Sequence, residues 1–316
     1  MSKAKSIFRR IANQTKKWTL PGFQGLSLYD VLKHFGNGFN GPHLTERAAA
    51  ISYNFIMSIP PTCLFLFTLV PNLPFISKSG LKMQLHDLVY DIIPSKTYNT
   101  GVIEFIDSLI DGNKIGLISF TFIISLFFAS NAVIGIMRSF NKDYVGFETI
   151  KGIKKRWEAI KLTLMLFGLV TTYLFLLLLQ SNFLNWLGVR DINIKSLIIV
   201  GRWLLIIGLL FYMFAFIYRY APSTTKRWKL VSPGAVLATT LCIVVTIGFT
   251  SFVDNFGQYN LLYGSLGTIM VVMIMVFLNS LVVLVGFEFN LSIHMMKSEE
   301  EIASVNILGK KKFAEK

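Results

Sequence analysis

The chain alternates between long apolar runs and short polar connections. A helix needs about 20 mostly apolar residues to cross the hydrocarbon core of a bilayer. Six runs of about that length occur, at residues 48–70, 116–137, 162–187, 196–218, 234–256 and 267–289. The pattern predicts an all-α integral membrane protein with six transmembrane helices.

Two stretches outside these runs are amphipathic. Residues 27–36 have Leu28, Val31, Leu32 and Phe35 on one helical face, which predicts a short helix lying at the inner membrane surface. The long connection between the first two runs has apolar helical faces on both sides of Pro94. It predicts two amphipathic helices packed on the outer mouth, for which a plain structural lid is the favoured interpretation.

Basic residues gather in alternate connections. Lysine and arginine concentrate at residues 1–47, 138–161, 219–229 and 297–312. The other three connections have few bases or balance them with acids. Because cytoplasmic loops carry the excess of positive charge, both termini should be cytoplasmic, which agrees with an even number of spans. The expected location is the plasma (inner) membrane.

The chain therefore divides into three predicted parts. Residues 1–43 form a basic cytoplasmic segment with the interfacial helix, and residues 44–295 form the six-span membrane domain. Residues 296–316 form a charged cytoplasmic tail.

Composition supports this class. Of 316 residues, 53% are hydrophobic and 15% are charged, whereas soluble domains carry about 25% charged residues. The net charge of +14 is explained by topology, so no nucleic-acid partner is expected. The cysteines, Cys63 and Cys242, lie inside apolar runs, which excludes a disulfide framework.

Polar residues near the inner ends of the spans are candidates for a functional site, because such groups are costly in a membrane unless they pair. The ionisable ones are Glu46, Arg47, Arg138 and Glu288. Two interpretations stay open: one ion-pair cluster where three helices meet, or separate helix ends that contact headgroups and water.

Amides accompany these charges. Asn54 and Asn131 each lie seven residues from an arginine, Arg47 and Arg138, so each amide shares a helical face with a base. Asn290 follows Glu288 closely at the end of the sixth run.

On the outer side, Arg202 and Asp254 form a further candidate set. They would relieve each other's desolvation if they paired. The alternative, slightly favoured, is that Arg202 extends its head to the interface.

Motifs for enzyme chemistry are missing from the sequence. The four histidines are scattered, and there is no HExxH, CxxC, GxxxxGK[ST] or GxSxG. We therefore expect no cofactor, no metal and no enzymatic activity.

Several blocks resemble the YihY/BrkB family, UPF0761-type inner-membrane proteins formerly labelled "ribonuclease BN". The blocks are ERAAAISYNFIMSIPP at 46–61, FFASNAVIGIMRSFNKDYV at 127–145, SPGAVLATT at 232–240 and DNFGQYNLLYGSLG, which opens the stretch 254–290. The resemblance covers about residues 25–295 and implies a six-span inner-membrane protein. Members of the family have also been proposed as transporters or exporters.

The resulting functional expectation is a transporter, exporter or flippase of a lipid-like or anionic amphipathic substrate. Its partners would be membrane lipids and this substrate, and self-association into a homo-oligomer is left open. The candidate path or polar network adds residues at the outer mouth, Tyr259, Asn260 and Tyr263. A membrane scaffold that binds a cytoplasmic partner is the alternative, and a ribonuclease is disfavoured because a metal site is missing.

Overall fold

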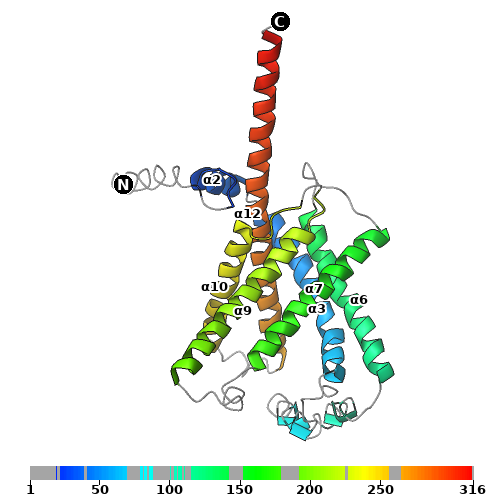
Figure 1. Cartoon of the computed structure of the whole chain (residues 1–316). Coiled ribbons are helices and arrows are strands. Elements are labelled where there is room, and N and C mark those ends of the chain that lie inside the picture. Colours follow the sequence, from blue (N-terminus) through cyan, green and yellow to red (C-terminus); the bar gives the residue numbers. More distant parts are fainter. Residues whose placement is uncertain are drawn as a thin grey trace.

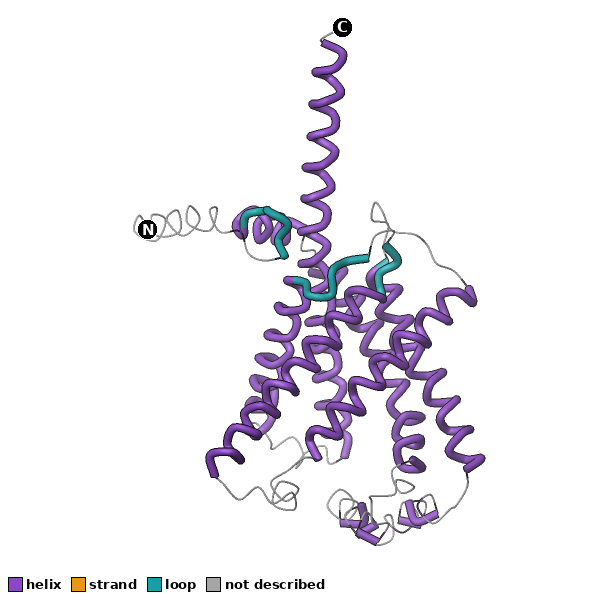
Figure 2. Tube along the Cα trace, in the orientation of Figure 1, coloured by secondary structure: helices purple, strands orange, loops and turns teal. Residues whose placement is uncertain are grey.

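The computed structural model describes most of the helical part of the chain. The described residues are 19, 22–38, 41–69, 115–141, 152–178, 192–224, 227–255 and 265–314, with scattered residues between 79 and 110. Within them the structure consists of helices and short turns, without a strand (Figure 2).

Six long helices run up and down in one bundle (Figure 1). They are α3 (Gly41–Leu69), α6 (Ile115–Phe140), α7 (Gly152–Leu178), α9 (Ile192–Tyr220), α10 (Pro233–Asn255) and α12 (Ser265–Ala314). The shorter α2 (Leu28–Gly38) lies beside α12. We call the end of the bundle near α2 the α2 end; α3, α7 and α10 begin there and α6 and α9 finish there.

Five of these helices are long and apolar enough to cross a membrane. The qualifying segments are His43–Phe65, Ser119–Phe140, Trp203–Tyr220, Pro233–Val253 and Ile269–Ile302. In α7, which contains the start of the predicted third span, 162–187, the side chains are described only as far as Thr172. This described part includes Lys155, Arg156, Glu158 and Lys161 and does not meet the same criterion. The all-helical membrane architecture is confirmed, whereas the count of six spans stays a prediction.

Two helix boundaries differ from the sequence-based expectation. The first span begins earlier, at Gly41, and continues through Pro60 and Pro61. The last helix does not end with its apolar run but continues to Ala314, projecting from the α2 end (Figure 1). Its polar extension contains strong helix formers such as glutamate and lysine, so the helix has no local reason to end.

Aromatic side chains fill the centre of the bundle near the α2 end. The rings of Phe140 on α6 and Phe287 on α12 stack with centroids 4.0 Å apart. Tyr218 of α9 is buried beside Phe140 and donates a hydrogen bond to the carbonyl of Val283, at 2.9 Å. These contacts join three helices at the level of the candidate site.

Small residues let α10 and α12 approach closely. A Cβ atom on Gly286 would lie 2.7 Å from the carbonyl oxygen of Gly234 and 2.8 Å from Cβ of Ala238. Close backbone approach at small residues is a usual way for membrane helices to gain packing energy. Asn290 adds polar links, because its side chain accepts from the backbone N–H of Gly234 at 2.7 Å and donates to Ser232 at 2.9 Å.

The short helix predicted at 27–36 is present as α2. Val31 and Phe23 are buried against Phe289 and Ile293 of α12, so the apolar face packs on protein. Leu32 stays 49% exposed.

The α10–α12 contact gives a first prediction. Gly286→Ala should lower the free energy of unfolding by about 1–3 kcal/mol, because the added methyl group overpacks the helix contact. Gly248→Ala is the control, since nothing lies within 4 Å of the position of its Cβ atom. Thermal unfolding of both variants in detergent measures the difference, and equal unfolding temperatures would contradict the close contact.

Candidate functional site

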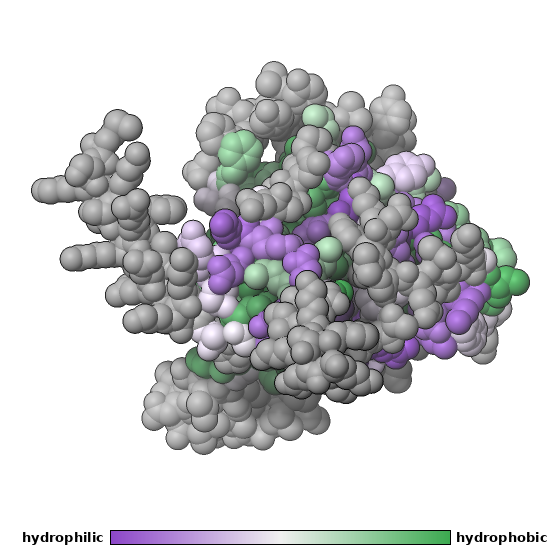
Figure 3. All heavy atoms as spheres, turned by 90° about the horizontal axis from the view of Figure 1, so that it is seen from above, coloured by the Kyte–Doolittle hydropathy of each residue, from purple (hydrophilic) through white to green (hydrophobic). Residues whose placement is uncertain are grey.

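The polar residues of the predicted site gather at the α2 end. Figure 3 looks onto this end and shows hydrophilic residues distributed across it between apolar patches. Two separate arrangements account for most of the described candidates: an ion pair between α3 and α12, and a cavity between α3, α6 and α7.

The ion pair joins Arg47 of α3 to Glu288 of α12. Their side chains are 2.5 Å apart at the closest nitrogen and oxygen and are only 10% and 16% exposed. Arg47 also donates to the backbone carbonyl of Ser139 on α6. A single guanidinium therefore holds three helices together, because its several donors are fixed in one plane.

The other two ionisable candidates do not join this pair. Glu46 is adjacent to Arg47 on the helix and therefore points about 100° away from it; its side chain is 77% exposed and lies 3.9 Å from His43. Arg138 is exposed and lines the cavity instead. The three-helix junction thus contains the Arg47–Glu288 ion pair and the bond from Arg47 to the Ser139 carbonyl, and neither Glu46 nor Arg138 is part of that ion pair.

The cavity lies where α7 begins beside α3 and α6. Its volume is about 350 Å³, and its lining residues are Asn54, Asn131, Ile134, Arg138, Gly152, Lys155 and Arg156. Asn131, Ile134 and Arg138 share one face of α6 because they lie three and four residues apart. The described part of the wall combines three bases with two amides and has no carboxylate.

Arg156 is held in place within this wall. Its guanidinium donates to the side-chain oxygens of Asn131, at 2.6 Å, and Ser130, at 3.1 Å. It also lies over the ring of Phe127, 4.0 Å from the centroid. These three partners are uncharged, so the contacts orient the guanidinium beside the cavity without forming an ion pair with it.

Burial and a neighbouring positive charge affect the protonation of Lys155. Partial burial lowers the pKa of its ammonium group, and the positive charge of Arg138 lowers that pKa further. An anion in the cavity would oppose both effects, because it stabilises the charged form of the lysine. The arrangement is therefore suited to binding an anionic group.

Asn290 belongs neither to the ion pair nor to the cavity between α3, α6 and α7. It is 6% exposed and bonds the start of α10, as described above. The side chains of Arg202 and Asp254, and residues Tyr259, Asn260 and Tyr263, lie outside the described part of the structure. Their predicted roles stay predictions.

Lys155 and Arg156 were not predicted as site residues. The sequence marks them as part of a basic connection, which explains their charge by topology alone. The feature of the sequence that could have pointed to Arg156 is the amide of Asn131, since a polar group within a span needs a partner from a neighbouring helix. Among the described residues, no three His, Cys, Asp or Glu side chains gather as a metal site.

Fold and site together define a multi-pass α-helical membrane protein with a base-lined cavity at one end of its bundle. The chain belongs to the family described as virulence factor BrkB, whose model matches residues 36–306. This confirms the resemblance carried by the sequence blocks.

Similar proteins occur in several bacteria. The ribonuclease-like protein YfkH of Bacillus subtilis is 29% identical over 80% of this chain and 90% of its own length. The UPF0761 membrane protein NTHI0384 of Haemophilus influenzae is 23% identical over 81% of this chain and 93% of its own. A UPF0761 membrane protein of Alteromonas mediterranea is 24% identical over 79% of this chain and 83% of its own. No solved structure matches the fold.

The ion pair gives a second prediction. Arg47→Ala and Glu288→Ala should each cost about 3–5 kcal/mol of stability, because each removes the ion pair while the other member's charge stays buried. The double variant should cost clearly less than the sum of the two. Unfolding of the single and double variants in detergent measures this coupling.

Glu46→Ala is the matched control for this cycle. Its carboxylate is the next one along α3 but is largely exposed, so its removal should change stability by less than about 0.5 kcal/mol. Purely additive costs for Arg47 and Glu288 would show that they do not stabilise each other.

Proposed function

We propose that this protein transports an anionic amphipathic molecule across the inner membrane, with the cavity between α3, α6 and α7 as the site that receives its anionic group. The single observation that carries the proposal is the wall of Arg138, Lys155 and Arg156, which no carboxylate faces among the residues that the structure describes. The charge of a base on an ordinary protein surface is compensated by nearby acids or by water. Here the three bases line the same cavity.

The transport proposal assumes a particular topology for the protein in the membrane. It counts α7 as a membrane span, which makes six, and takes both termini as cytoplasmic, in agreement with the distribution of lysine and arginine. The α2 end is then the cytoplasmic end, and α2 lies at the inner membrane surface. In this orientation the cavity receives substrate from the cytoplasm or from the inner leaflet.

An amphipathic substrate is favoured because the cavity is surrounded by membrane-spanning helices. Phe127 and Ile134 lie beside the bases on α6, so polar and apolar contacts are available to one molecule. The ion pair of Arg47 and Glu288 lies outside this cavity and supports its walls by fixing α3 to α6. No enzymatic step is part of the proposal.

Flux measurements test the proposal. Purified protein in vesicles should move a fluorescent phosphatidylglycerol between leaflets faster than protein-free vesicles do, and faster than it moves a phosphatidylcholine with the same label. The double variant Arg138→Gln, Arg156→Gln should lose at least tenfold of this rate, because it removes two of three cavity charges while keeping hydrogen-bonding groups.

Lys161→Gln is the control. Lys161 is a further base on α7, but it pairs with Glu158 at 3.2 Å and lies outside the cavity, so its rate should equal that of the unchanged protein. Absence of flux for lipids and small anions in the unchanged protein would overturn transport and favour the scaffold. A scaffold would instead lose its function when the basic segments 1–40 and 138–161 are exchanged.

A pH dependence follows from Lys155. Because burial and the charge of Arg138 lower the pKa of this group, anion binding must restore its charge, and affinity should fall as pH rises through that lowered pKa. A sulfate-headgroup amphipath is the suitable probe, since its own charge stays constant. Binding measured in nanodiscs from about pH 7 to pH 10 should show the decline.

Lys155→Arg should move this decline to higher pH, because an arginine stays charged throughout the range. The same pH profile in the variant and the unchanged protein would exclude Lys155 as the titrating group.

A further inference from the structure

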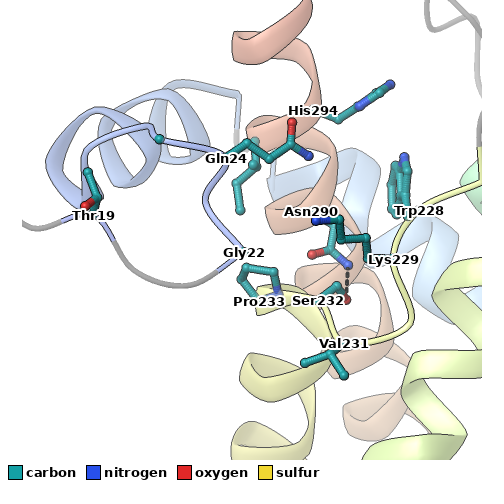
Figure 4. A pocket seen from close by; sticks show the side chains of 12 residues that line it. Thr19, Gly22, Gln24, Trp228, Lys229, Val231, Ser232, Pro233, Asn290 and His294 are labelled. Atoms are coloured by element: carbon teal, nitrogen blue, oxygen red, sulfur yellow. Dashed lines mark hydrogen bonds between the residues drawn. The ribbon is translucent and has the colours of Figure 1, made fainter.

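A second cavity lies at the α2 end, on the other side of α12. Its volume is about 490 Å³, and it is enclosed by the turn at residues 22–25, the segment 228–233 and one face of α12 (Figure 4). On α12 the wall consists of Asn290, Ile293 and His294, which share a face because they are three and four residues apart.

The inner wall of this cavity is already built by contacts within the protein. Asn290 bonds Ser232 at 2.9 Å, a bond drawn in Figure 4. The ring of Trp228 stacks on Phe287, with centroids 5.6 Å apart, and lies 6.0 Å from the ring of His294. A wall held in this way keeps its shape without an occupant, which lowers the cost of binding one.

The polar side chains nearer the opening are mostly donors. Lys229, His294 and Gln24 line the cavity, and no Asp or Glu is found among its described lining residues. Lys229 and Gln24 are exposed, so both side chains can turn toward a bound group. The charge of the cavity is therefore positive or neutral, and it is suited to an oxygen-rich anion.

The opening continues onto an apolar surface of α10. Val231 lines the cavity and is 65% exposed. Val236, Val244 and Ile247 follow along one face of α10 and are 52%, 60% and 65% exposed. With Pro233 at their head, these residues form a mainly apolar stripe that leads away from the cavity along the membrane-spanning part of the helix. Thr240 lies between Val236 and Val244 on this face, and its hydroxyl donates to the carbonyl of Val236 at 3.0 Å.

We propose that this cavity binds the phosphate headgroup of an anionic phospholipid, with its acyl chains along the α10 stripe. The donors fit the phosphate oxygens, and the stripe fits the chains. Trp228 supplies the kind of aromatic wall that is common at the headgroup level. The bound lipid would connect the 22–25 turn, the start of α10 and the end of the apolar part of α12.

This site is separate from the cavity between α3, α6 and α7 and does not depend on transport. Its occupant stays bound and stabilises the fold, whereas the transport proposal concerns a moving substrate. Failure of the flux measurements would therefore leave this proposal intact, and the reverse also holds.

Native mass spectrometry of the full-length protein in detergent tests the proposal. Phosphatidylglycerol should bind at least fivefold more tightly than phosphatidylcholine. The double variant Lys229→Gln, His294→Gln should remove this preference. Lys297→Gln is the control, because Lys297 is the next base along α12 but pairs with Glu300 at 2.7 Å and does not line the cavity.

A second variant tests the chains without changing the cavity. Val236→Asn places an amide on the exposed stripe and should weaken phosphatidylglycerol binding at least twofold. Val236→Asn also tests the lipid proposal if the double variant fails to fold. Equal binding of both lipids by the unchanged protein, or unchanged preference in the variants, would overturn the proposal.

Glycerol 3-phosphate distinguishes a lipid from a soluble phosphate. It has the same kind of charged group but no chains, so it should not displace bound phosphatidylglycerol at equal concentration. Displacement by glycerol 3-phosphate would assign the cavity to a free phosphate compound and overturn the lipid proposal.

Discussion

The buried contact between Arg47 and Glu288 is the interaction on which the arrangement at the α2 end depends. In an apolar bundle, a charge without a partner is far more costly than a misplaced apolar side chain, so the pair fixes the heights of α3 and α12 relative to each other. The bond from Arg47 to the carbonyl of Ser139 extends this constraint to α6. Apolar packing alone would tolerate small sliding of these helices, because lipid and protein offer similar contacts.

Both cavities lie next to helices that this pair positions. Asn54 lies two turns beyond Arg47 on α3, and Arg138 directly precedes Ser139 on α6, so the first cavity takes its walls from helices joined through Arg47. Asn290 lies two residues beyond Glu288 and faces the second cavity. The α12 helix therefore separates the two cavities: Glu288 contacts α3, while Asn290 and His294 face α10 and the 22–25 turn.

The helical class and the positions of most spans could be predicted from the sequence, because uninterrupted apolar runs of this length are typical of membrane-spanning helices. The ends of the helices were harder to predict from the sequence. The lysines and glutamates after residue 296 mark the end of the apolar run, but they are also good helix formers, so α12 continues far beyond it.

The site was predictable only in part. The spacing of seven residues placed Asn54 with Arg47 and Asn131 with Arg138, yet spacing along one helix does not say which neighbour completes the site. Lys155 and Arg156 enter the first cavity because α7 crosses beside α6 at its beginning, and that crossing is a tertiary property. The pairing of Arg47 with Glu288, instead of with the nearer Glu46, is tertiary in the same way.

The two cavities differ in how much positive charge lines them. The first has three bases, one of them an Arg156 fixed by Asn131, Ser130 and Phe127, and its occupant meets a strong and oriented field. The second has one lysine and one histidine at an opening that continues onto an apolar helix face. A strongly charged site binds and releases an anion according to how well that charge is screened or neutralised, whereas a weakly charged site with an apolar extension retains its occupant mainly through buried hydrocarbon. Under the two proposals, the first cavity exchanges its anion and the second retains a lipid. This difference follows from which face of α6 or α12 carries the polar residues.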